Sequence, residues 1–264
     1  MPELVEVEAY RRLAERVVGR RVAEVVAPDA WYLKKGLTAG TLTAALTGRT
    51  VTAARRVGKV LLLHTDGPTL GLRFGMSGRL LVDGEAAVDD LVYASNRDLE
   101  KWDRFALRFA RPGGGDLRSR DPRRLGGVEL SPVESPVESR LGPDALTVTP
   151  SALVRALQSD APLKARLMDQ RRLAGVGNLA ADEALWRAGL DPARSARSLS
   201  PAEHRRLHRH LRATMADLLE RGGSHTGDLM DQRRLGGLCP RDGTALVRRT
   251  VGGRTTWSCP RHQH

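Results

Sequence analysis

The chain has 264 residues, of which 41% are hydrophobic and 28% charged, a composition typical of globular proteins that excludes a largely disordered chain. No apolar run approaches the roughly 20 residues of a membrane helix, and no secretion signal begins the chain, so we expect no membrane association. Lys and Arg number 43 against 31 Asp and Glu, and the formal charge of +12 favours a polyanionic partner, above all nucleic acid. Two cysteines cannot form a disulfide framework, which indicates a cytosolic protein.

The first half of the chain combines one helical segment with many short strands. Residues 3–18 are rich in helix formers, and Gly19 ends that segment. Between about residues 20 and 130, β-branched runs alternate with Gly, Pro and Asp turns, as in an antiparallel sandwich or barrel; the clearest runs are Val22–Val26, Thr50–Ala54, Val60–His64 and Phe105–Phe109. We therefore expect a β-sandwich domain over residues 1–130, followed by a linker over residues 131–150, which contain four prolines.

The second half has helical periodicity. Helices are predicted over residues 151–158, from Pro162, over 179–188 and over 201–221. The chain then ends in a two-stranded hairpin, in which Ala245–Arg249 pairs with Thr255–Ser258 about Gly252-Gly253. Together these elements predict an α+β multidomain fold, with a helical domain over residues 151–235 and a terminal hairpin over residues 236–264.

Lysine is scarce in this sequence. Only five of the 43 basic residues are lysines, at positions 34, 35, 59, 101 and 164. A compositional bias of the genome explains the excess of arginine. A lysine kept within that bias is nevertheless a candidate for a function that arginine cannot perform.

Two short knuckles flank the terminal hairpin and supply four candidate metal ligands. They are Cys239-Pro-Arg-Asp242 and Cys259-Pro-Arg-His262, with 16 residues between Asp242 and Cys259. So short a tail has almost no core, and a bound metal would explain how it folds. The four residues can form a closed tetrahedral zinc site, with His264 or a water as the alternative to Asp242, the weakest ligand. A hairpin without metal is the competing interpretation.

A glycine-rich turn precedes the helix predicted from Leu179. Gly175 and Gly177 allow the backbone to approach a ligand closely, and Asn178 is expected at the N-cap. A helix N-terminus favours an anion, here a DNA phosphate. Taken alone, the motif is explained better by an ordinary capped turn.

The N-terminus offers a nucleophile. Met1 precedes a small residue and is of the kind usually removed, which leaves the secondary amine of Pro2 free. The pKa of such an amine is near 8, against roughly 10.4 for lysine, so far more of it is neutral at pH 7. A neutral amine can attack a sugar C1′ and form an iminium, with Glu3 and Glu6 close enough in sequence to move protons. Pro-Glu is also a common helix start, and a retained Met1 would make the Pro2 nitrogen an unreactive amide.

Together these segments resemble the formamidopyrimidine-DNA glycosylase/endonuclease VIII family of bacteria, with a variant zinc finger. The resemblance extends over essentially the whole chain and rests on seven ordered segments. They are Pro2-Glu3-Leu4-Val5-Glu6-Val7-Glu8, Gly58-Lys59-Val60-Leu61-Leu62-Leu63, Gly75-Met76-Ser77-Gly78, Asp121-Pro122-Arg123-Arg124-Leu125-Gly126, Pro162-Leu163-Lys164-Ala165 through Leu167-Met168-Asp169-Gln170, Gly175-Val176-Gly177-Asn178, and Asp182-Glu183.

The resemblance implies a β-sandwich, a helix–two-turns–helix domain and a zinc-finger hairpin, with DNA in the cleft between the two halves. It assigns Pro2 as nucleophile, Glu3 as catalytic acid/base and Glu6 as a supporting carboxylate. Phosphate-binding positions match Lys59, Asn178 and Arg254, with Lys59 next to the reacting sugar, and the DNA-contacting set also includes Lys164, which matches a lysine of the guanine-type subgroup. The residues that fill the space of the flipped nucleotide match Met76, Arg123 and Leu125.

Several positions depart from the family pattern. Val5 replaces a second proline, Arg73 replaces a frequent histidine, and Leu125 replaces an aromatic residue, which exchanges stacking for apolar filling. Asp242 and His262 replace two zinc cysteines at unchanged spacing. Only nine residues separate Leu229 from Cys239, fewer than in enzymes specialised for 8-oxoguanine, which predicts a more open base pocket.

The resemblance implies a bifunctional DNA glycosylase/AP lyase of base excision repair that uses β- and then δ-elimination. Purine-type lesions (8-oxoguanine, formamidopyrimidines) are favoured over oxidised pyrimidines or abasic sites. The alternative is a non-catalytic paralogue that binds damaged DNA, against which Pro2 and Glu3 together argue. The chain's ten aromatic residues disfavour a single-strand-binding module. We expect a cytoplasmic, nucleoid-associated monomer that binds damaged double-stranded DNA and carries a structural zinc ion.

Overall fold

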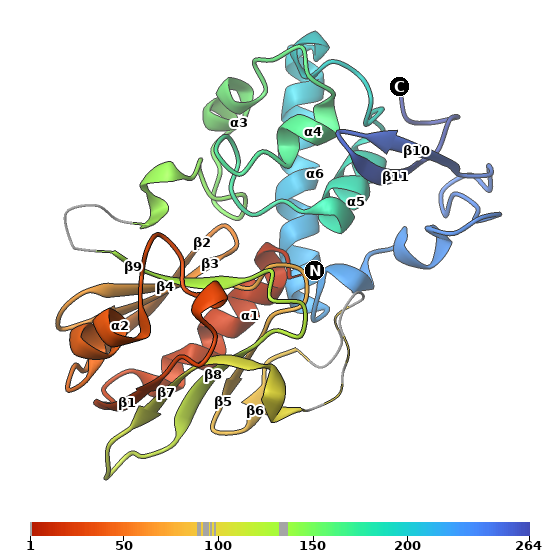
Figure 1. Ribbon diagram of the computed structural model, residues 1–264. Helices are drawn as coiled ribbons and strands as arrows, with labels where there is room; N and C mark the ends of the chain where they lie inside the picture. Colours follow the sequence, from red (N-terminus) through yellow and green to blue (C-terminus); the bar gives the residue numbers. More distant parts are fainter. Residues whose placement is uncertain (1, 89–90, 92–94, 96, 98, 132–136) are drawn as a thin grey trace. The chain divides into compact units, whose positions relative to one another are not determined.

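The computed structural model describes residues 2–88, 91, 95, 97, 99–131 and 137–264, and its contacts divide the chain into two compact units (Figure 1). Unit 1 contains Pro2 and Glu6–Arg140, and unit 2 contains Glu3–Val5 and Leu141–His264. Glu3 therefore belongs to unit 2 although it directly follows Pro2. Within the described ranges, no helix combines the length and apolar character that crossing a membrane requires. The domain limits given above remain predictions, and residues 132–136 of the predicted linker lie outside the described residues.

Unit 1 is built from two antiparallel sheets. The four-stranded sheet has the order β2-β3-β4-β9, and the five-stranded sheet the order β1-β7-β8-β5-β6. The strands are β1 (Val22–Val26), β2 (Val51–Val57), β3 (Val60–Thr65), β4 (Thr69–Arg73), β5 (Arg79–Val82), β6 (Glu85–Ala86), β7 (Asp103–Phe109), β8 (Asp116–Arg120) and β9 (Gly127–Ser131). The β-branched runs predicted from the sequence lie within β1, β3 and β7 and overlap β2, which begins at Val51 instead of Thr50. In β3 the four consecutive residues from Val60 to Leu63 are buried, so both faces of this strand are covered.

Two helices complete the core of unit 1. Helix α1 (Leu4–Ala14) contributes Val7, Tyr10 and Ala14 to the same buried cluster as the strands, and a 3₁₀ turn, Glu15–Val17, follows it. Helix α2 (Ala39–Leu46) was not predicted, although Thr38 and Thr41 form a capping box at its start. Its buried Leu42 and Leu46 join the core, so burial rather than local propensity stabilises it.

Unit 2 is helical. Its helices are α3 (Pro150–Ala156), α4 (Leu163–Leu167), α5 (Asn178–Ala188) and α6 (Pro201–Glu220). Thr149 caps α3, which therefore starts before the predicted Ser151. A continuous apolar core joins these helices to Leu4 and Val5, so the beginning of the chain packs into the helical unit.

The hairpin of unit 2 consists of β10 (Val247–Val251) and β11 (Arg254–Ser258). Gly252 and Gly253 form its turn with φ values of 58° and 73°. Two successive positive φ values favour glycine and match the twist of the strands. With this hairpin, the predicted α+β architecture is confirmed.

Candidate functional site

Backbone donors inside unit 2 hold Glu3, the predicted acid/base. Its Oε1 accepts a hydrogen bond from the N–H of Leu179 at 2.9 Å, and its Oε2 accepts one from the N–H of Ala180 at 3.1 Å. These N–H groups lie in the first turn of α5 and have no partner within the helix. Gly177 permits the approach, since a Cβ there would lie 2.1 Å from Glu3 Cδ. The two N–H groups therefore bind the carboxylate of Glu3, whereas the sequence predicted a DNA phosphate at this helix N-terminus.

Asn178 is the first residue of α5, and Gly177 is the N-cap. The prediction of Asn178 as N-cap is therefore wrong, because the carboxylate of Glu3 occupies the donors that a capping side chain would satisfy. The side-chain Oδ1 of Asn178 is buried and has no hydrogen-bond partner among the described residues. The amide group of Asn178 is thus not used to begin the helix.

The turn before α5 is shaped around the N-terminal segment. Gly175 has a φ of 109°, and a Cβ there would lie 2.3 Å from Leu4 Cδ1. The backbone N–H of Leu4 donates to the carbonyl of Gly175 at 3.2 Å. Gln170 supports the turn from the other side, since its Oε1 accepts from the N–H of Gly175 and its Nε2 donates to the carbonyl of Val176. Leu4, and with it the adjacent Glu3, is thereby fixed.

Pro2 and Glu6 are both buried. Burial together with the negative charge of Glu6 raises the pKa of the Tyr10 hydroxyl well above its usual range. That hydroxyl donates to the carbonyl of Gly78 at 3.1 Å. Helix α1 therefore links the N-terminal segment to the turn that contains Met76.

The three residues predicted to fill the space of a flipped nucleotide lie on two adjoining loops of unit 1. Met76 is half-buried, whereas Arg123 and Leu125 are exposed. Gly75 has a φ of 57°, and a Cβ there would lie 2.4 Å from the carbonyl carbon of Leu125. Only glycine allows the two backbones to approach so closely.

Asp121 joins the same two loops through its buried carboxylate. It accepts hydrogen bonds from Ser77 Oγ at 2.5 Å, from the N–H of Arg123 at 3.1 Å and from the N–H of Gly126 at 2.8 Å. A carboxylate with three donors is a strong positioning group. The sequence reasoning did not single it out, although it lies within the quoted Asp121–Gly126 segment.

Lys59 and Arg73 lie at the same end of the four-stranded sheet. Lys59 follows Gly58 in the turn between β2 and β3, and its neighbour Val60 pairs with Arg73 on β4. Arg73 Nε donates to Glu129 at 2.9 Å, and Lys35 pairs with the same carboxylate. Burial opposes ionisation of Glu129, but the hydrogen bonds and charges of Lys35 and Arg73 outweigh it and lower its pKa.

Lys164 was predicted to contact DNA, and its position in unit 2 contradicts that prediction. Its side chain is 0% exposed, and its Nζ lies 2.7 Å from Asp182 Oδ1. Burial lowers the pKa of Lys164, while the charge of Asp182 offsets part of this effect. Arg233 also pairs with Asp182. The ammonium is thus enclosed in an internal ion-pair network and cannot reach a phosphate in this structure.

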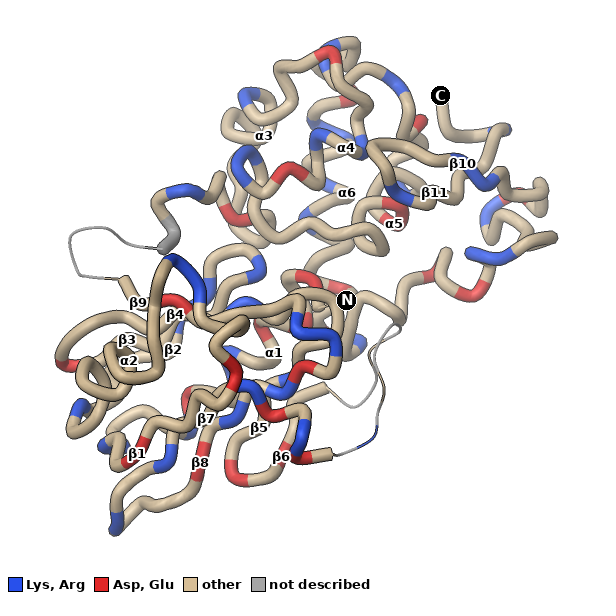
Figure 2. Tube along the Cα trace, viewed as in Figure 1, with Lys and Arg blue, Asp and Glu red and all other residues tan. Residues whose placement is uncertain are grey.

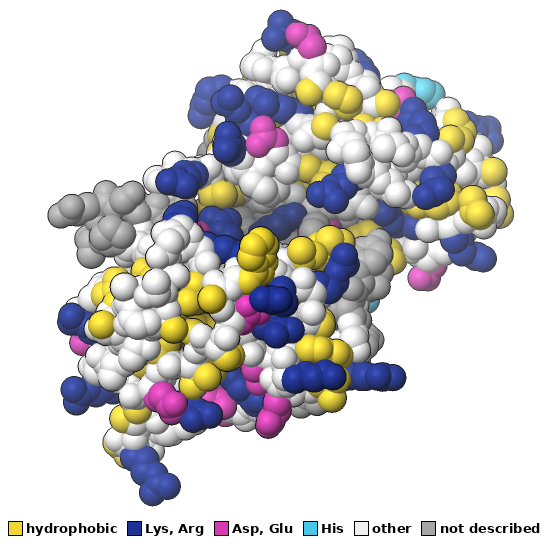
Figure 3. All heavy atoms as spheres, viewed as in Figure 1, with side chains coloured by type: hydrophobic (Ala, Val, Ile, Leu, Met, Phe, Trp, Pro, Cys, Tyr) yellow, Lys and Arg dark blue, Asp and Glu magenta, His cyan; other side chains and the backbone are white. Residues whose placement is uncertain are grey.

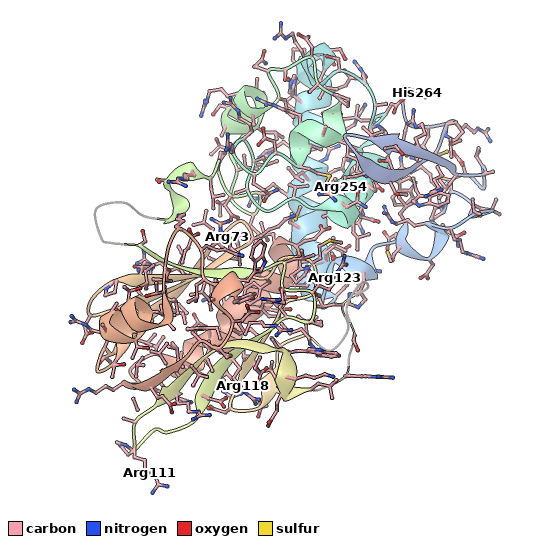
Figure 4. All side chains as sticks on the ribbon, in the orientation of Figure 1. Arg73, Arg111, Arg118, Arg123, Arg254 and His264 are labelled. Atoms are coloured by element: carbon pink, nitrogen blue, oxygen red, sulfur yellow. The ribbon has the colours of Figure 1, made fainter. Side chains whose placement is uncertain are left out.

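Lys164 instead supports the hairpin that carries Arg254. Its Nζ donates to the carbonyl of Thr255 at 3.1 Å and to Thr256 Oγ1 at 2.8 Å. Arg254 itself is exposed and directly follows the Gly-Gly turn of the hairpin; Figure 4 labels its position. The Lys and Arg positions occur along the backbone of both units and are not gathered in one segment (Figure 2).

Cys239, Asp242, Cys259 and His262 form one cluster, with one ligand atom from each lying within 4.8 Å of the others. Cys239 Sγ and His262 Nδ1 are 3.5 Å apart, while Asp242 Oδ2 lies 3.4 Å from both Cys259 Sγ and His262 Nδ1. Such separations suit the edges of a tetrahedron with metal–ligand bonds of about 2.0–2.3 Å. His264 does not belong to the cluster.

The surroundings of the cluster orient its ligands. His262 Nε2 donates to the carbonyl of Trp186 at 3.1 Å, which leaves the lone pair of Nδ1 directed at the cluster. Trp186 Nε1 donates to Cys239 Sγ at 3.3 Å. The N–H of Thr244 lowers the pKa of Asp242 and keeps its carboxylate anionic. These donors fit a closed structural zinc site.

Comparisons with known proteins match both units. Residues 1–128 match the formamidopyrimidine-DNA glycosylase N-terminal domain, and residues 141–238 match the H2TH domain of the same enzymes. The chain is 37% identical to the formamidopyrimidine-DNA glycosylase of Paracoccus denitrificans, over 98% of this chain and 99% of the relative, and 36% identical to that of Thermus thermophilus, over 98% and 97%. The chain belongs to the formamidopyrimidine-DNA glycosylase family. It is accordingly an enzyme, a DNA glycosylase of base excision repair.

Solved structures agree with this assignment. The Lactococcus lactis Fpg in complex with DNA containing an abasic site has a TM-score of 0.82 and 26% identity, and both chains are covered completely. A complex of the same enzyme with DNA containing N7-benzyl-Fapy-dG has a TM-score of 0.83. The predicted family resemblance is confirmed.

Glu183 is a further anchor of this glycosylase that was not predicted from the sequence. Glu183 accepts hydrogen bonds from the N–H groups of Asp228 and Leu229, and a Cβ at Gly227 would lie 2.6 Å from Glu183 Oε2. Arg187 pairs with both Glu183 and Asp228. The start of the short Leu229–Cys239 connection is thereby tied to α5. The quoted Asp182-Glu183 pair was the available signal, but its partners lie more than 40 residues away.

Proposed function

We propose that this glycosylase excises oxidised bases from double-stranded DNA with the amine of Pro2 and then cleaves the strand as an AP lyase. The amine attacks C1′, the N-glycosidic bond breaks, and the base leaves with a proton. Opening of the sugar ring places a proton on O4′ and forms an iminium between Pro2 and C1′. Loss of a C2′ proton expels the 3′ phosphate, a second elimination expels the 5′ phosphate, and hydrolysis releases Pro2.

The position of Glu3 carries this proposal. It directly follows the nucleophile, and two N–H groups of α5 together with the helix N-terminus stabilise its negative charge. A fixed carboxylate beside the amine can take up and return the protons that attack and ring opening require. Glu6, which is buried and lies four residues after Pro2, is proposed as a supporting carboxylate.

DNA binding is proposed to involve both units. Lys59, Asn178 and Arg254 would contact phosphates. The Lactococcus lactis complexes with DNA that contains an abasic site or N7-benzyl-Fapy-dG support damaged DNA as the ligand. Met76, Arg123 and Leu125 would fill the space left by the flipped nucleotide. Lys164 is assigned a supporting role through the hairpin instead of direct contact.

We further propose that the Cys239–Asp242–Cys259–His262 cluster holds a structural zinc ion. Four protein ligands close the tetrahedron and leave no position for substrate, so the ion would stabilise the hairpin and take no part in the reaction. The orientation of His262 and the donors to Cys239 and Asp242 support this assignment.

Purine-type lesions are the proposed substrates. The second candidate is oxidised pyrimidines, which the short connection between Leu229 and Cys239 favours because less of the chain is available to enclose a large base. A panel of duplexes that contain 8-oxoguanine, a formamidopyrimidine or thymine glycol, measured by single-turnover excision, distinguishes the two.

Borohydride trapping tests the mechanism. Mass spectrometry first establishes that Met1 has been removed, and the enzyme is then reduced with borohydride on an abasic-site duplex. A covalent complex is expected for both the wild type and Glu3→Gln, formed at different rates. None is expected for Pro2→Gly whose N-terminal amine has been blocked by acetylation. Absence of a complex from processed wild type would refute the lyase mechanism, and an undiminished complex from blocked Pro2→Gly would identify a different nucleophile.

A further inference from the structure

Trp31 is a large aromatic residue of unit 1 that is 68% exposed to solvent. It lies in a short 3₁₀ turn, Ala30–Tyr32, whose other aromatic residue, Tyr32, is fully buried. Because this indole contributes so little to the core, packing does not explain why a tryptophan is present at this position. It lines an open depression of about 630 Å³ together with Lys101, Arg104 and Arg124.

Asp29 ties Trp31 to the loop that carries Arg123 and Leu125. One carboxylate oxygen accepts from the N–H of Trp31 at 3.1 Å, and both oxygens accept from Arg124 at 2.6 Å. Arg124 has a φ of 57°, an uncommon conformation for a residue other than glycine, so the bidentate pair holds a strained position of that loop. Trp31 is therefore presented beside the loop at a defined position.

Two lysines that the sequence left without a role lie around this indole. Lys34 Nζ is 5.4 Å from the centre of the Trp31 ring and donates to the Trp31 carbonyl at 2.7 Å. Lys101 lines the depression and is exposed. Three acidic residues also line the depression. Asp29 pairs with Arg124, and Asp103 pairs with Arg118 and Arg120, whereas Glu100 is exposed. An aromatic face among cations is the arrangement with which proteins stack nucleobases beside a phosphate backbone.

On the drawn face of unit 1, exposed hydrophobic side chains lie directly among Lys and Arg (Figure 3). Arg123 and Leu125, which under the proposed function replace the flipped nucleotide, would face the base left unpaired in the other strand. A side chain anchored beside their loop through Asp29 then lies along that strand. We infer that Trp31 is a stacking platform for a nucleotide of the undamaged strand, and that Lys34 and Lys101 contact the phosphates next to it.

This inference rests on the proposed function, which supplies the role of Arg123 and Leu125, and it adds a contact that neither catalysis nor nucleotide flipping uses. Loss of one base–aromatic stack weakens binding by about tenfold, within a range of about 5- to 150-fold. Trp31→Ala should therefore raise the Kd for a duplex with a tetrahydrofuran abasic-site analogue by about tenfold, as measured by fluorescence anisotropy. Trp31→Phe retains a stacking face and should recover most of the affinity.

Control variants separate this effect from general changes of the surface. Val18→Ala removes another exposed apolar side chain of unit 1, which is 41% exposed. Arg111→Ala removes an exposed cation from the turn between β7 and β8, at the far end of unit 1 from Arg123 (Figure 4). Neither variant should change Kd, and the melting temperature of Trp31→Ala should equal that of the wild type, since the indole is outside the core.

Photocrosslinking of the wild-type protein identifies the strand. Duplexes carry 5-iodouracil at successive positions of either strand, and the crosslinked peptide is identified by mass spectrometry. A Trp31 adduct from the undamaged strand supports the inference; an unchanged Kd for Trp31→Ala, or Trp31 adducts from the damaged strand alone, would overturn it. If the wild type binds and crosslinks as expected but forms no borohydride complex, the proposed mechanism fails and the DNA contact stands.

Discussion

Replacing Gly177 with alanine is expected to displace the carboxylate of Glu3 from its backbone donors. A Cβ at this position would lie 2.1 Å from Glu3 Cδ and 2.3 Å from its Oε1. The backbone of Gly177 is extended, with a φ of −116° and a ψ of −168°, so alanine adopts it without strain. The clash with Glu3 is therefore the direct consequence of the substitution.

The magnitude follows from the two hydrogen bonds that this carboxylate accepts. Each hydrogen bond to a charged group contributes about 1.5–3 kcal/mol, so loss of one or both lowers the free energy of unfolding by about 1.5–6 kcal/mol. For a unit of this size, the melting temperature should fall by at least about 5 °C. Displacement of a catalytic group by about 1 Å costs on the order of 100-fold in rate.

Two measurements on Gly177→Ala test this reasoning. Single-turnover excision of 8-oxoguanine gives the rate of the chemical step, and circular dichroism gives the melting temperature. Gly40→Ala is the matched control, because a Cβ there meets only Thr38 Oγ1 at 3.9 Å and alanine is favoured in helix α2. A Gly177→Ala enzyme with the wild-type rate and melting temperature would refute the argument that Glu3 is held by α5.

Three further predictions concern unit 2. Lys164→Met removes one of the two cationic partners of the buried Asp182 and leaves Arg233, so it should lower the free energy of unfolding by about 1.5–3 kcal/mol in denaturant titrations; an unchanged value would contradict the internal ion-pair network. The hydrogen bond from Arg194 lowers the pKa of Glu203 from 4.5 to about 2. The stability that this ionised carboxylate contributes is present above pH 4.5 and is lost as the pH falls through about 2. The melting temperature of Glu203→Gln should therefore lie furthest below that of the wild type near pH 7, and the difference should disappear toward pH 2. A difference that does not change with pH would exclude this carboxylate as the cause. Removal of zinc by a strong chelator should lower the melting temperature and expose Trp257, which is 6% exposed, with a red shift of its fluorescence, whereas a purified protein without zinc would rule out the site.

Local sequence patterns predicted much of the secondary structure and the cluster of four candidate metal ligands. Short β-branched runs between turn residues located strands in unit 1, and the Gly252-Gly253 turn located the terminal hairpin, because these signals depend on a few adjacent residues. The spacing of Cys239, Asp242, Cys259 and His262 likewise predicted their convergence, since each knuckle brings its own pair of ligands together. Helix α2 was missed because its capping box is built from two threonines within a β-rich region.

The sequence by itself determined which residue types are present at the proposed catalytic centre, but not what holds them. Glu3 is fixed by N–H groups 176 and 177 residues away, and Lys164 is buried against residues of the distant hairpin instead of reaching DNA. The same limit applies to the lysines that composition had marked as unusual. The surroundings of Lys34 and Lys101 are visible only in the tertiary structure. Lys34 lies over the ring of Trp31, Lys101 lines the same depression as Trp31, and Asp29 pairs with Arg124 of the neighbouring loop. Contacts between distant segments decide whether a charged side chain faces solvent, an ion-pair partner or a ligand, and those contacts are made only when the chain folds.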